Sequence, residues 1–391
     1  MNQARCPLVN QPRVYTIKQQ ISKGEMVEKY KQQEYVRFMA VGDMLFCCDL
    51  GERLRGSGDY DYPFYKIKNF LKKADFLYGN LETMITAKRQ PEKYAGAGIY
   101  YSDPPVGQAL ARAHFKAVNL AHNHMYDFGA EAVESTIQLL SEVGVMYHGV
   151  GSDFSFARQP LEFDVKDFRI GMLGYCSASV STDKKHKYVT CPIKSSIIKR
   201  DVSNLVKRVD FAIVTLHEGA CNYPSPQHRH WSKVAVDAGA KLVISHHSHV
   251  ISGIEEYNGA VIAYGLGDFV GTFEGKESRE AFILDCLLKS DGTIEYEAVP
   301  IWINYGFQPE VAVGEKKREI SDYIESLSEK LRTGESDKEY WAQMKKSYFR
   351  AAFADTMRLV RGEGIVGVIR KLKKLRWHHI QLLFKSVFRK S

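Results

Sequence analysis

The 391-residue sequence has no run of eighteen consecutive apolar residues, so it predicts no membrane-spanning helix. Its first thirty residues mix basic, acidic and amide side chains without the apolar segment of a signal peptide, and we therefore expect none. Low-complexity tracts and internal repeats are also lacking. With 45% hydrophobic and 26% charged residues, and 12 prolines against 30 glycines, the composition is that of a globular protein and excludes a disordered or fibrous one.

Cysteine is present but unpatterned. The seven cysteines form no CxxC motif and no close Cys/His pair of the zinc-finger type, and their number is odd. This usage argues against a disulfide framework and favours a reducing compartment. Together with the lack of a leader, it predicts a cytoplasmic protein.

Basic residues exceed acidic ones only at the end of the chain. The formal net charge is +8, and residues 361–391 hold nine Lys or Arg against one acid, Glu363, whereas the preceding 360 residues hold 45 of each sign. A neutral body with a basic tail argues against a nucleic-acid enzyme, whose binding face would make the body itself basic. We therefore expect no nucleic-acid partner.

The basic tail has helical periodicity. Apolar residues recur at spacings of three to five between Ile365 and Val387, with Lys and Arg between them, which predicts a basic amphipathic helix. Such a helix either packs on the body or uses residues 363–391 to contact a partner or an anionic membrane surface. The second alternative would place the protein peripherally on the inner membrane.

Strands and helices alternate through the body, which predicts an α/β protein. Expected strands lie at 35–42, 74–78, 115–121, 169–175, 211–216, 241–245 and 261–264, followed by a hairpin of 281–289 and 293–300. Expected helices lie at 64–73, 105–113, from 129, 195–209 and 231–238. From about Phe307 the sequence loses strand character. We therefore predict an N-terminal extension (1–34), a body (35–305) and a helical, basic C-terminal extension (306–391).

Metal-binding side chains follow five of the predicted strands. Ligand sites in α/β sheets gather at the carboxyl ends of strands, where loops converge. A single histidine there is more often structural, but five coincidences favour a metal centre, because carboxylate, amide and imidazole groups suit Mn, Fe or Zn. The five clusters contain Asp43; Asn80 and Glu82; His122, Asn123, His124 and Asp127; His217 and Glu218; and His246, His247 and His249.

Two clusters allow finer predictions. If Asn123 offers its oxygen to a cation, His124 next to it can act as a general acid or stabilise charge. Asp127 either orients the His124 imidazole or merely caps the following helix. In an extended segment His247 and His249 face one side, which makes them the better ligand pair, whereas His246 is structural or supports a ligand.

Six motifs, in order and spacing, resemble the bacterial CapA family, which is associated with poly-γ-glutamate capsule and other surface-polymer synthesis. They are VGDM (41–44), GNLE (79–82), NLAHNHMYDFG (119–129), HEG (217–219), GAKLVISHHSHV (239–250) and YGLGDF (264–269). The resemblance covers about residues 35–305 and implies a calcineurin-like metallophosphoesterase fold, a four-layer α/β/β/α sandwich with one or two divalent ions at one end.

The resemblance also implies roles for individual residues. The implied metal ligands are Asp43, Glu82, Asn123, His217, His247 and His249, with His124 in the catalytic position and Asp127 beside it. Asn80, His122, Glu218, His246 and Asp268 would contact substrate or support the ligands. The implied partner is a surface-polymer precursor or the complex that assembles the polymer.

The sequence departs from the phosphoesterase pattern at several positions. Asp43 is followed by Met44 and Leu45 instead of completing Asp-x-His, and Asn80 stands where that pattern has a bridging aspartate. Glu218 and Asp268 are acids at positions where the family has Trp and Asn, and they either compensate or mark a different substrate. We therefore keep three hypotheses: a metal-dependent hydrolase acting on a phosphoester or polymer linkage, a non-catalytic binding component of a polymer-assembly complex, and a general phosphodiesterase unrelated to surface polymers.

Overall fold

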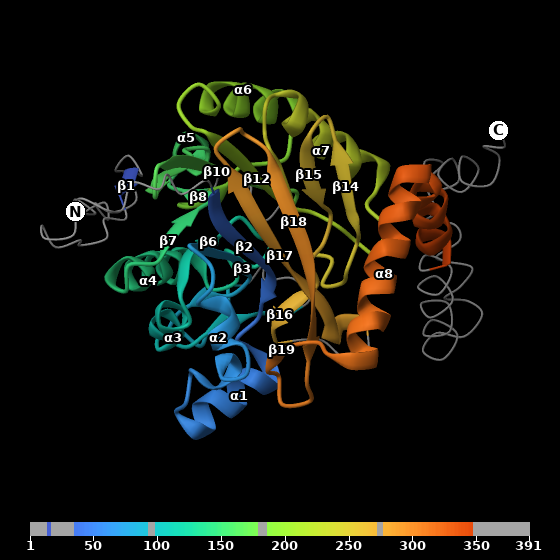
Figure 1. Ribbon diagram of the computed structural model, residues 1–391. Helices are drawn as coiled ribbons and strands as arrows, with labels where there is room; N and C mark the ends of the chain where they lie inside the picture. Colours follow the sequence, from blue (N-terminus) through green and yellow to red (C-terminus); the bar gives the residue numbers. More distant parts are fainter. Residues whose placement is uncertain (1–13, 17–34, 93–97, 179–185, 272–276, 347–391) are drawn as a thin grey trace, which may run out of the picture. The chain divides into compact units, whose positions relative to one another are not determined.

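The computed structural model describes residues 14–16, 35–92, 98–178, 186–271 and 277–346 (Figure 1). The chain divides into two compact units, 1–337 and 338–391. Of the second unit only 338–346 are described, and they are helical. Within the described residues, no helix is both long enough and apolar enough to cross a bilayer.

The first unit is built around two large sheets. The eight-stranded sheet has the order β19-β18-β17-β2-β3-β6-β7, with β16 pairing with β2. Its strands are β2 (Tyr35–Met44), β3 (Phe76–Leu81), β6 (Phe115–Asn119), β7 (Met146–His148), β16 (Asp268–Val270), β17 (Glu280–Lys289), β18 (Ile294–Ile303) and β19 (Pro309–Val311). Neighbours from β2 to β7 are parallel, so their carboxyl ends share one edge.

The seven-stranded sheet has the order β1-β9-β10-β12-β13-β15-β14. Its strands are β1 (Val14–Thr16), β9 (Leu161–Val165), β10 (Phe168–Cys176), β12 (Phe211–His217), β13 (Leu242–His246), β15 (Ala260–Ala263) and β14 (Ile254–Tyr257). Strands β10, β12, β13 and β15 are parallel. Two small ladders pair β4 (Met84–Ile85) with β5 (Tyr101–Ser102) and β8 (Val150–Gly151) with β11 (Val189–Thr190).

Side-chain alternation along β2 shows how the layers form. Phe38 and Ala40 enter the core between the two sheets, whereas Met39 and Val41 enter a second core beneath helices. Phe76 links the sheets, because its ring stacks on Phe163 of β9 at a centroid distance of 4.1 Å. Apolar side chains on both faces of the sheet therefore require a covering layer on each side.

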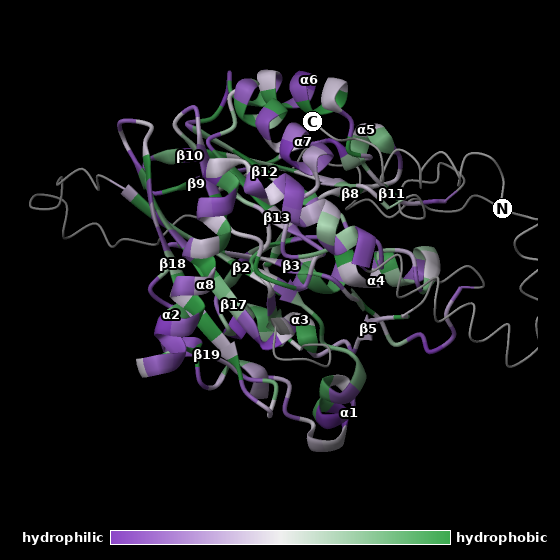
Figure 2. Ribbon diagram, turned by 90° about the vertical axis from the view of Figure 1, so that its right-hand side faces the viewer, coloured by the Kyte–Doolittle hydropathy of each residue, from purple (hydrophilic) through white to green (hydrophobic). Residues whose placement is uncertain are grey.

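Helices cover the outer face of each sheet (Figure 1). On the eight-stranded sheet lie α1 (Cys48–Ser57), the 3₁₀ turn Tyr62–Phe64, α2 (Lys68–Leu71), α3 (Val106–Arg112) and α4 (Gly129–Glu142). On the seven-stranded sheet lie α5 (Phe154–Ala157), α6 (Ser195–Leu205) and α7 (Pro226–Asp237). Helices such as α4 and α6 alternate hydrophilic and hydrophobic segments, as one-sided packing requires (Figure 2). The predicted four-layer α/β/β/α sandwich is confirmed.

The end of the body differs from the prediction. A further strand, β19, forms after the position where the sequence loses strand character, and α8 (Gly314–Thr333) follows it. Ile320, Ile324 and Leu327 of α8 are buried in the core between the sheets. The first compact unit therefore continues to Asp337 rather than ending near residue 305. Residues 363–391, and all of 1–34 except β1, lie outside the described residues.

Most predicted strands and helices form near their expected positions, and the differences have local causes. Helix α7 begins at Pro226, five residues before the predicted start, because the Ser225 side chain accepts a hydrogen bond from the His228 N–H and caps it. The predicted helix 64–73 is only a 3₁₀ turn and the single turn of α2. Helix α1 was not predicted, and it begins directly after the strand that carries Asp43.

Candidate metal centre

The carboxyl ends of five parallel strands from both sheets meet at one place. Within the eight-stranded sheet, Asp43 pairs in register with Asn80, and Asn80 with Asn119. In the other sheet, His217 pairs with His246. The two edges touch, because Asp43 Oδ1 lies 3.2 Å from His246 Nδ1 and Asp43 Oδ2 accepts a hydrogen bond of 3.0 Å from the His247 backbone N–H.

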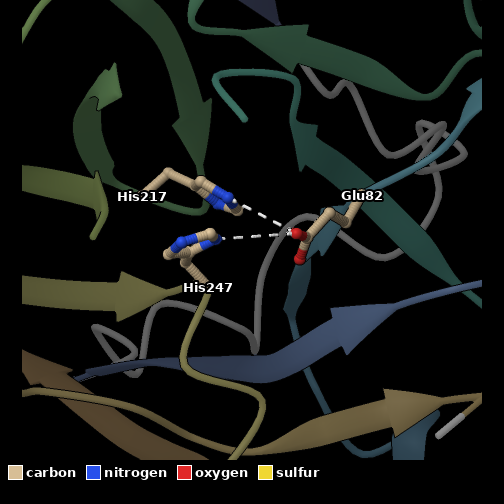
Figure 3. A group of neighbouring side chains, drawn as sticks. All are labelled: Glu82, His217 and His247. Carbon is tan, nitrogen blue, oxygen red and sulfur yellow. Dashed lines mark ion pairs between the residues drawn. The ribbon is translucent and has the colours of Figure 1, made fainter. Parts of the chain in front are cut away.

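The first group of potential ligands is Glu82, His217 and His247 (Figure 3). Glu82 Oε1 lies 3.4 Å from His217 Nε2 and 3.9 Å from His247 Nδ1. Figure 3 shows both imidazoles directed toward the carboxylate. One donor atom from each residue falls within a mutual distance of 4.8 Å, which is close enough for one ion to bind all three.

The second group is Asp43, His249 and Asp268, whose donor atoms meet the same criterion. His249 Nδ1 lies 2.9 Å from Asp268 Oδ1 and 3.4 Å from Asp43 Oδ2. His249 Nε2 lies 3.7 Å from Glu82 Oε1, so this imidazole lies next to both groups. The sequence predicted His249 and Asp43 as ligands but placed Asp268 in a supporting role; here Asp268 stands with the potential ligands.

Unpaired buried atoms fit a cation at this place. Among the described residues, Glu82 Oε1, His247 Nδ1 and Asp268 Oδ2 are buried without a hydrogen-bond partner. An unsatisfied polar atom in the interior costs free energy, and a buried carboxylate costs more. Oxygen and imidazole donors without a thiolate suit Mn, Fe or Zn. The residues present therefore fit a divalent ion of this class.

The charges of the two groups are strongly interdependent. Burial opposes the ionised form of Glu82, but the charge of His249 and the interaction with the His217 imidazole outweigh it and hold the pKa of Glu82 well below its ordinary value. Burial likewise opposes the charged imidazole of His249, yet Glu82 and Asp268 raise its pKa to about 10. Burial raises the pKa of Asp268 to about 7, although His249 opposes the shift. A protonated His249 thus balances part of the negative charge of the two groups.

Two further histidines remain neutral. Burial lowers the pKa of His217 to about 4, against the opposing effect of Glu82. Burial and the nearby His217 hold the pKa of His122 well below its usual value, and the two rings lie 6.0 Å apart. A neutral imidazole is the form that binds a metal. His122 is fully buried behind His217, consistent with the supporting place predicted for it.

Asn123 lies beside the Glu82 group, and its neighbour His124 contacts Asp127. Asn123 Oδ1 is 2.6 Å from His217 Nε2, so the amide borders the Glu82 group. His124 Nδ1 lies 2.8 Å from Asp127 Oδ2. The capping alternative for Asp127 does not hold, because α4 begins two residues later without a side-chain cap. Asp127 instead fixes the orientation of the His124 ring.

Tyr100 completes the surroundings of His124, and sequence reasoning missed it. Its backbone N–H donates to Asp127 Oδ2 at 3.0 Å, and its ring centroid lies 4.2 Å from that of His124. Burial, with the nearby Cys47, raises the pKa of its hydroxyl to about 12. No local pattern identifies this tyrosine, since it lies outside the predicted strands and belongs to the segment before β5.

Two amide side chains link the neighbouring ends of β2, β3 and β6 in the eight-stranded sheet. Asn80 donates to Asp43 Oδ1 at 2.8 Å, and Asn119 donates to Asn80 Oδ1 at 2.8 Å. The Asn80 amide nitrogen also lies 3.3 Å from Glu82 Oε2, so it contacts two potential ligands. Asn119 was not among the predicted site residues, although it opens the motif NLAHNHMYDFG and its place at a strand end marks it.

The His246–His249 segment is not extended, contrary to the basis of the prediction. His247 and His249 have φ angles of 97° and 57°, and these left-handed conformations turn their side chains toward different groups. Their ring centroids lie 6.2 Å apart. Buried His246 pairs with Asp43, and Glu218 joins the site through its backbone N–H, which donates to the His246 carbonyl at 3.1 Å.

Comparison with known proteins identifies a family for this chain. The model of the family described as "Bacterial capsule synthesis protein PGA_cap" matches residues 37–272. The chain belongs to this family. Every potential ligand of both groups falls within the range matched to PGA_cap. The resemblance read from the six motifs is thereby confirmed.

The chain is also similar to individual proteins in sequence and in structure. The capsule biosynthesis protein CapA of Bacillus anthracis is 28% identical over 71% of this chain and 70% of its own length. The PGA biosynthesis protein CapA of Bacillus subtilis is 28% identical over 62% of this chain and 66% of its own length. A novel phosphatase from Mycoplasma pneumoniae aligns in structure with a TM-score of 0.47 and 14% identity, over 68% of this chain and 94% of its own.

Proposed function

We propose that this PGA_cap protein is a metal-dependent hydrolase that cleaves a phosphoester or polymer linkage during synthesis of a capsule, poly-γ-glutamate or exopolysaccharide. The observation that carries the proposal is Glu82 Oε1, which is buried, has no hydrogen bond and lies within 4 Å of three imidazoles. The polymer class comes from the relatives, whose names refer to capsule, PGA and polyglutamine synthesis.

The two groups of ligands supply the cation sites of this proposal. Glu82, His217 and His247 would hold one ion, bordered by Asn123, and Asp43, His249 and Asp268 a second. A bound ion of this class acts as a Lewis acid on a phosphoryl or carbonyl oxygen. Asn80 and His246 keep the carboxylates in place through their contacts with Asp43.

His124 is the proposed general acid. Asp127 accepts the hydrogen bond from Nδ1, which leaves Nε2 to hold or deliver a proton. The ring is 90% buried and packs at a tilted angle against the Tyr100 ring, so it has a defined orientation. Such a group protonates the leaving oxygen or nitrogen when the linkage breaks.

The metal part of the proposal is tested by elemental analysis and by unfolding. Purified protein should retain Mn, Fe or Zn, and chelation should lower its thermal stability, because an ion at a concentration 100-fold above its Kd adds about 2.7 kcal/mol. Glu82→Gln should abolish this stabilisation without preventing folding, whereas Glu52→Gln on the exposed part of α1 should not change it. Wild-type protein that neither retains nor responds to these ions would refute the metal site.

The catalytic part is tested with His124→Ala. A panel of phosphoesters and of poly-γ-glutamate or polysaccharide fragments should identify an activity that the variant loses while it retains its metal. A variant that supports polymer production as well as wild type does would instead favour the alternative, a non-catalytic component that binds the polymer or its precursor within an assembly complex.

A further inference from the structure

Two adjacent cysteines lie where the segment after β2, the strand that carries Asp43, meets helix α1. Cys47 follows Asp43 by four residues, and Cys48 is the first residue of α1. Their Sγ atoms lie 3.5 Å apart, in hydrogen-bond contact. The four other described cysteines, Cys176, Cys191, Cys221 and Cys286, are all buried.

The two thiols have different environments. Cys47 is 8% exposed, whereas Cys48 is exposed to solvent. A reagent in solution therefore meets Cys48 first, and the Cys47 thiol is in place behind it. This arrangement of an accessible thiol with a second thiol in contact is typical of redox-active cysteine pairs.

The surroundings also favour the thiolate of Cys48. The hydrogen bond with Cys47 is the largest effect and lowers the pKa of Cys48 to about 7, against burial and the charges of Asp49 and Glu52. His124 also favours the thiolate. The hydrogen bond with Cys48 and burial raise the pKa of Cys47, which therefore keeps its proton. A thiolate, not a thiol, is the nucleophile in cysteine oxidation.

We propose that Cys47 and Cys48 form a peroxide-sensitive modification site that closes to a disulfide between adjacent residues. The Cys48 thiolate attacks one oxygen of hydrogen peroxide, and hydroxide leaves, which gives a sulfenic acid at Cys48. The Cys47 sulfur then attacks this sulfur while its proton passes to the departing hydroxyl, which leaves as water. The hydroxide released in the first step takes up the proton that Cys48 lost, so both thiols are oxidised and one peroxide is reduced to two water molecules. Closure needs the two sulfur atoms to approach from 3.5 Å to bonding distance.

The modification site borders the metal centre electrostatically. Cys47 interacts with the charges of Glu82 and Asp268, and Cys48 with that of His124. Oxidation removes the thiolate beside His124 and constrains the backbone at Cys47 and Cys48, where α1 begins. This consequence rests on the proposed function, and there we expect a lower rate of hydrolysis that a dithiol reductant restores.

The thiol chemistry is tested on the full chain without an activity assay. Trypsin releases residues 38–53 as one peptide that contains both cysteines and no other. After a modest excess of hydrogen peroxide, this peptide should lose two hydrogen atoms in mass and regain them on reduction. Sulfinic acid at Cys48, a dimer linked through Cys48, or an unchanged peptide would each overturn the proposal.

Two single variants sharpen the test. Cys48→Ser should prevent the mass change, and Cys47→Ala should leave Cys48 to oxidise further instead of forming the disulfide. In wild type, iodoacetamide should modify Cys48 at least about tenfold faster than the buried cysteines, because exposure and thiolate character control the rate. The pH midpoint of this reaction should rise in Cys47→Ala from about 7 toward about 8.5, the value of a free cysteine. An unshifted midpoint would contradict the role of Cys47.

Discussion

At the scale of single residues, the site contains three buried carboxyl groups close together. Asp43, Glu82 and Asp268 are each at most 1% exposed. Burying one carboxylate without compensation costs several kcal/mol, so three of them require the imidazoles and amides around them. The cluster therefore serves function at the expense of stability.

The role of Asp127 gives the first prediction. Asp127→Asn keeps the size of the side chain and an acceptor for the Tyr100 N–H, but it removes the charge that orients His124. If His124 is the general acid, we expect kcat to fall by about 10- to 100-fold. Metal content and melting temperature should stay close to wild type. Steady-state kinetics with elemental analysis measures both.

The control for Asp127→Asn is Asp49→Asn, on the exposed first turn of α1. It should leave kcat unchanged. An Asp127→Asn enzyme with full activity would remove Asp127 from the mechanism, and one that loses its metal would make Asp127 part of the ion site instead.

At the scale of elements, α7 is held to the seven-stranded sheet by a buried histidine. His228 is fully buried, its Nε2 lies 2.8 Å from the Ser245 hydroxyl of β13, and its ring packs edge-on against Tyr264. Burial is the main reason that its pKa falls to about 3. The folded protein therefore keeps this imidazole neutral.

That depressed pKa predicts an acid-sensitive contact. Below the unfolded-state value of about 6.5, the unfolded chain binds a proton that the folded chain does not, so stability falls as pH falls toward 3. The loss from this residue is about 2 kcal/mol between pH 7 and pH 5, at roughly 1.4 kcal/mol per pKa unit. His228→Gln removes this titration.

Urea denaturation at pH 7 and pH 5 measures the effect. The difference in unfolding free energy between wild type and His228→Gln should change by about 2 kcal/mol in favour of the variant at pH 5. His230, on the exposed face of α7, provides the control as His230→Gln. An equal pH dependence in wild type and His228→Gln would mean that His228 titrates normally in the folded protein.

At the scale of the whole molecule, α8 belongs to the body. Ile320 is fully buried in the core between the sheets, so Ile320→Ala should lower the unfolding free energy by about 2–5 kcal/mol. Arg318→Ala, on the exposed face of the same helix, should change it by less than about 0.5 kcal/mol. Equal effects of the two variants would show that α8 is dispensable.

We also expect a chain ending at Asp337 to fold, because the first compact unit ends there.

The basic tail gives the last prediction at this scale. We propose that residues 363–391 bind an anionic membrane surface, since the nine basic residues of 361–391 stand against one acid. Each basic residue near such a surface contributes about 1 kcal/mol, so deletion of 363–391 should release the protein from vesicles containing phosphatidylserine. Sedimentation with anionic and with neutral vesicles measures this, and equal binding of the full and shortened chains would refute it.

Much of this site was predictable because strand ends are visible in a sequence. Asp43, Glu82 and His217 each lie at or next to the end of an apolar strand, and parallel strands bring such positions to one edge. His249 was predicted as a ligand on the basis of an extended segment that does not form, and Asp268 was predicted only to contact substrate or support the ligands. Tyr100 was missed, since its contact with His124 joins segments that no periodic pattern connects.

The amino-acid sequence by itself determined the family, the layered α/β fold and most of the residues that gather at the strand ends, because periodicity and motif order are local properties. Only the tertiary structure decided how the residues divide into two groups of ligands, that α8 closes the body, and that Cys47 and Cys48 border the site. The reason is physical: the division into two groups depends on left-handed turns at His247 and His249 and on contacts between the two sheets. The places of α8 and of the two cysteines depend on interactions with residues that are distant in the sequence.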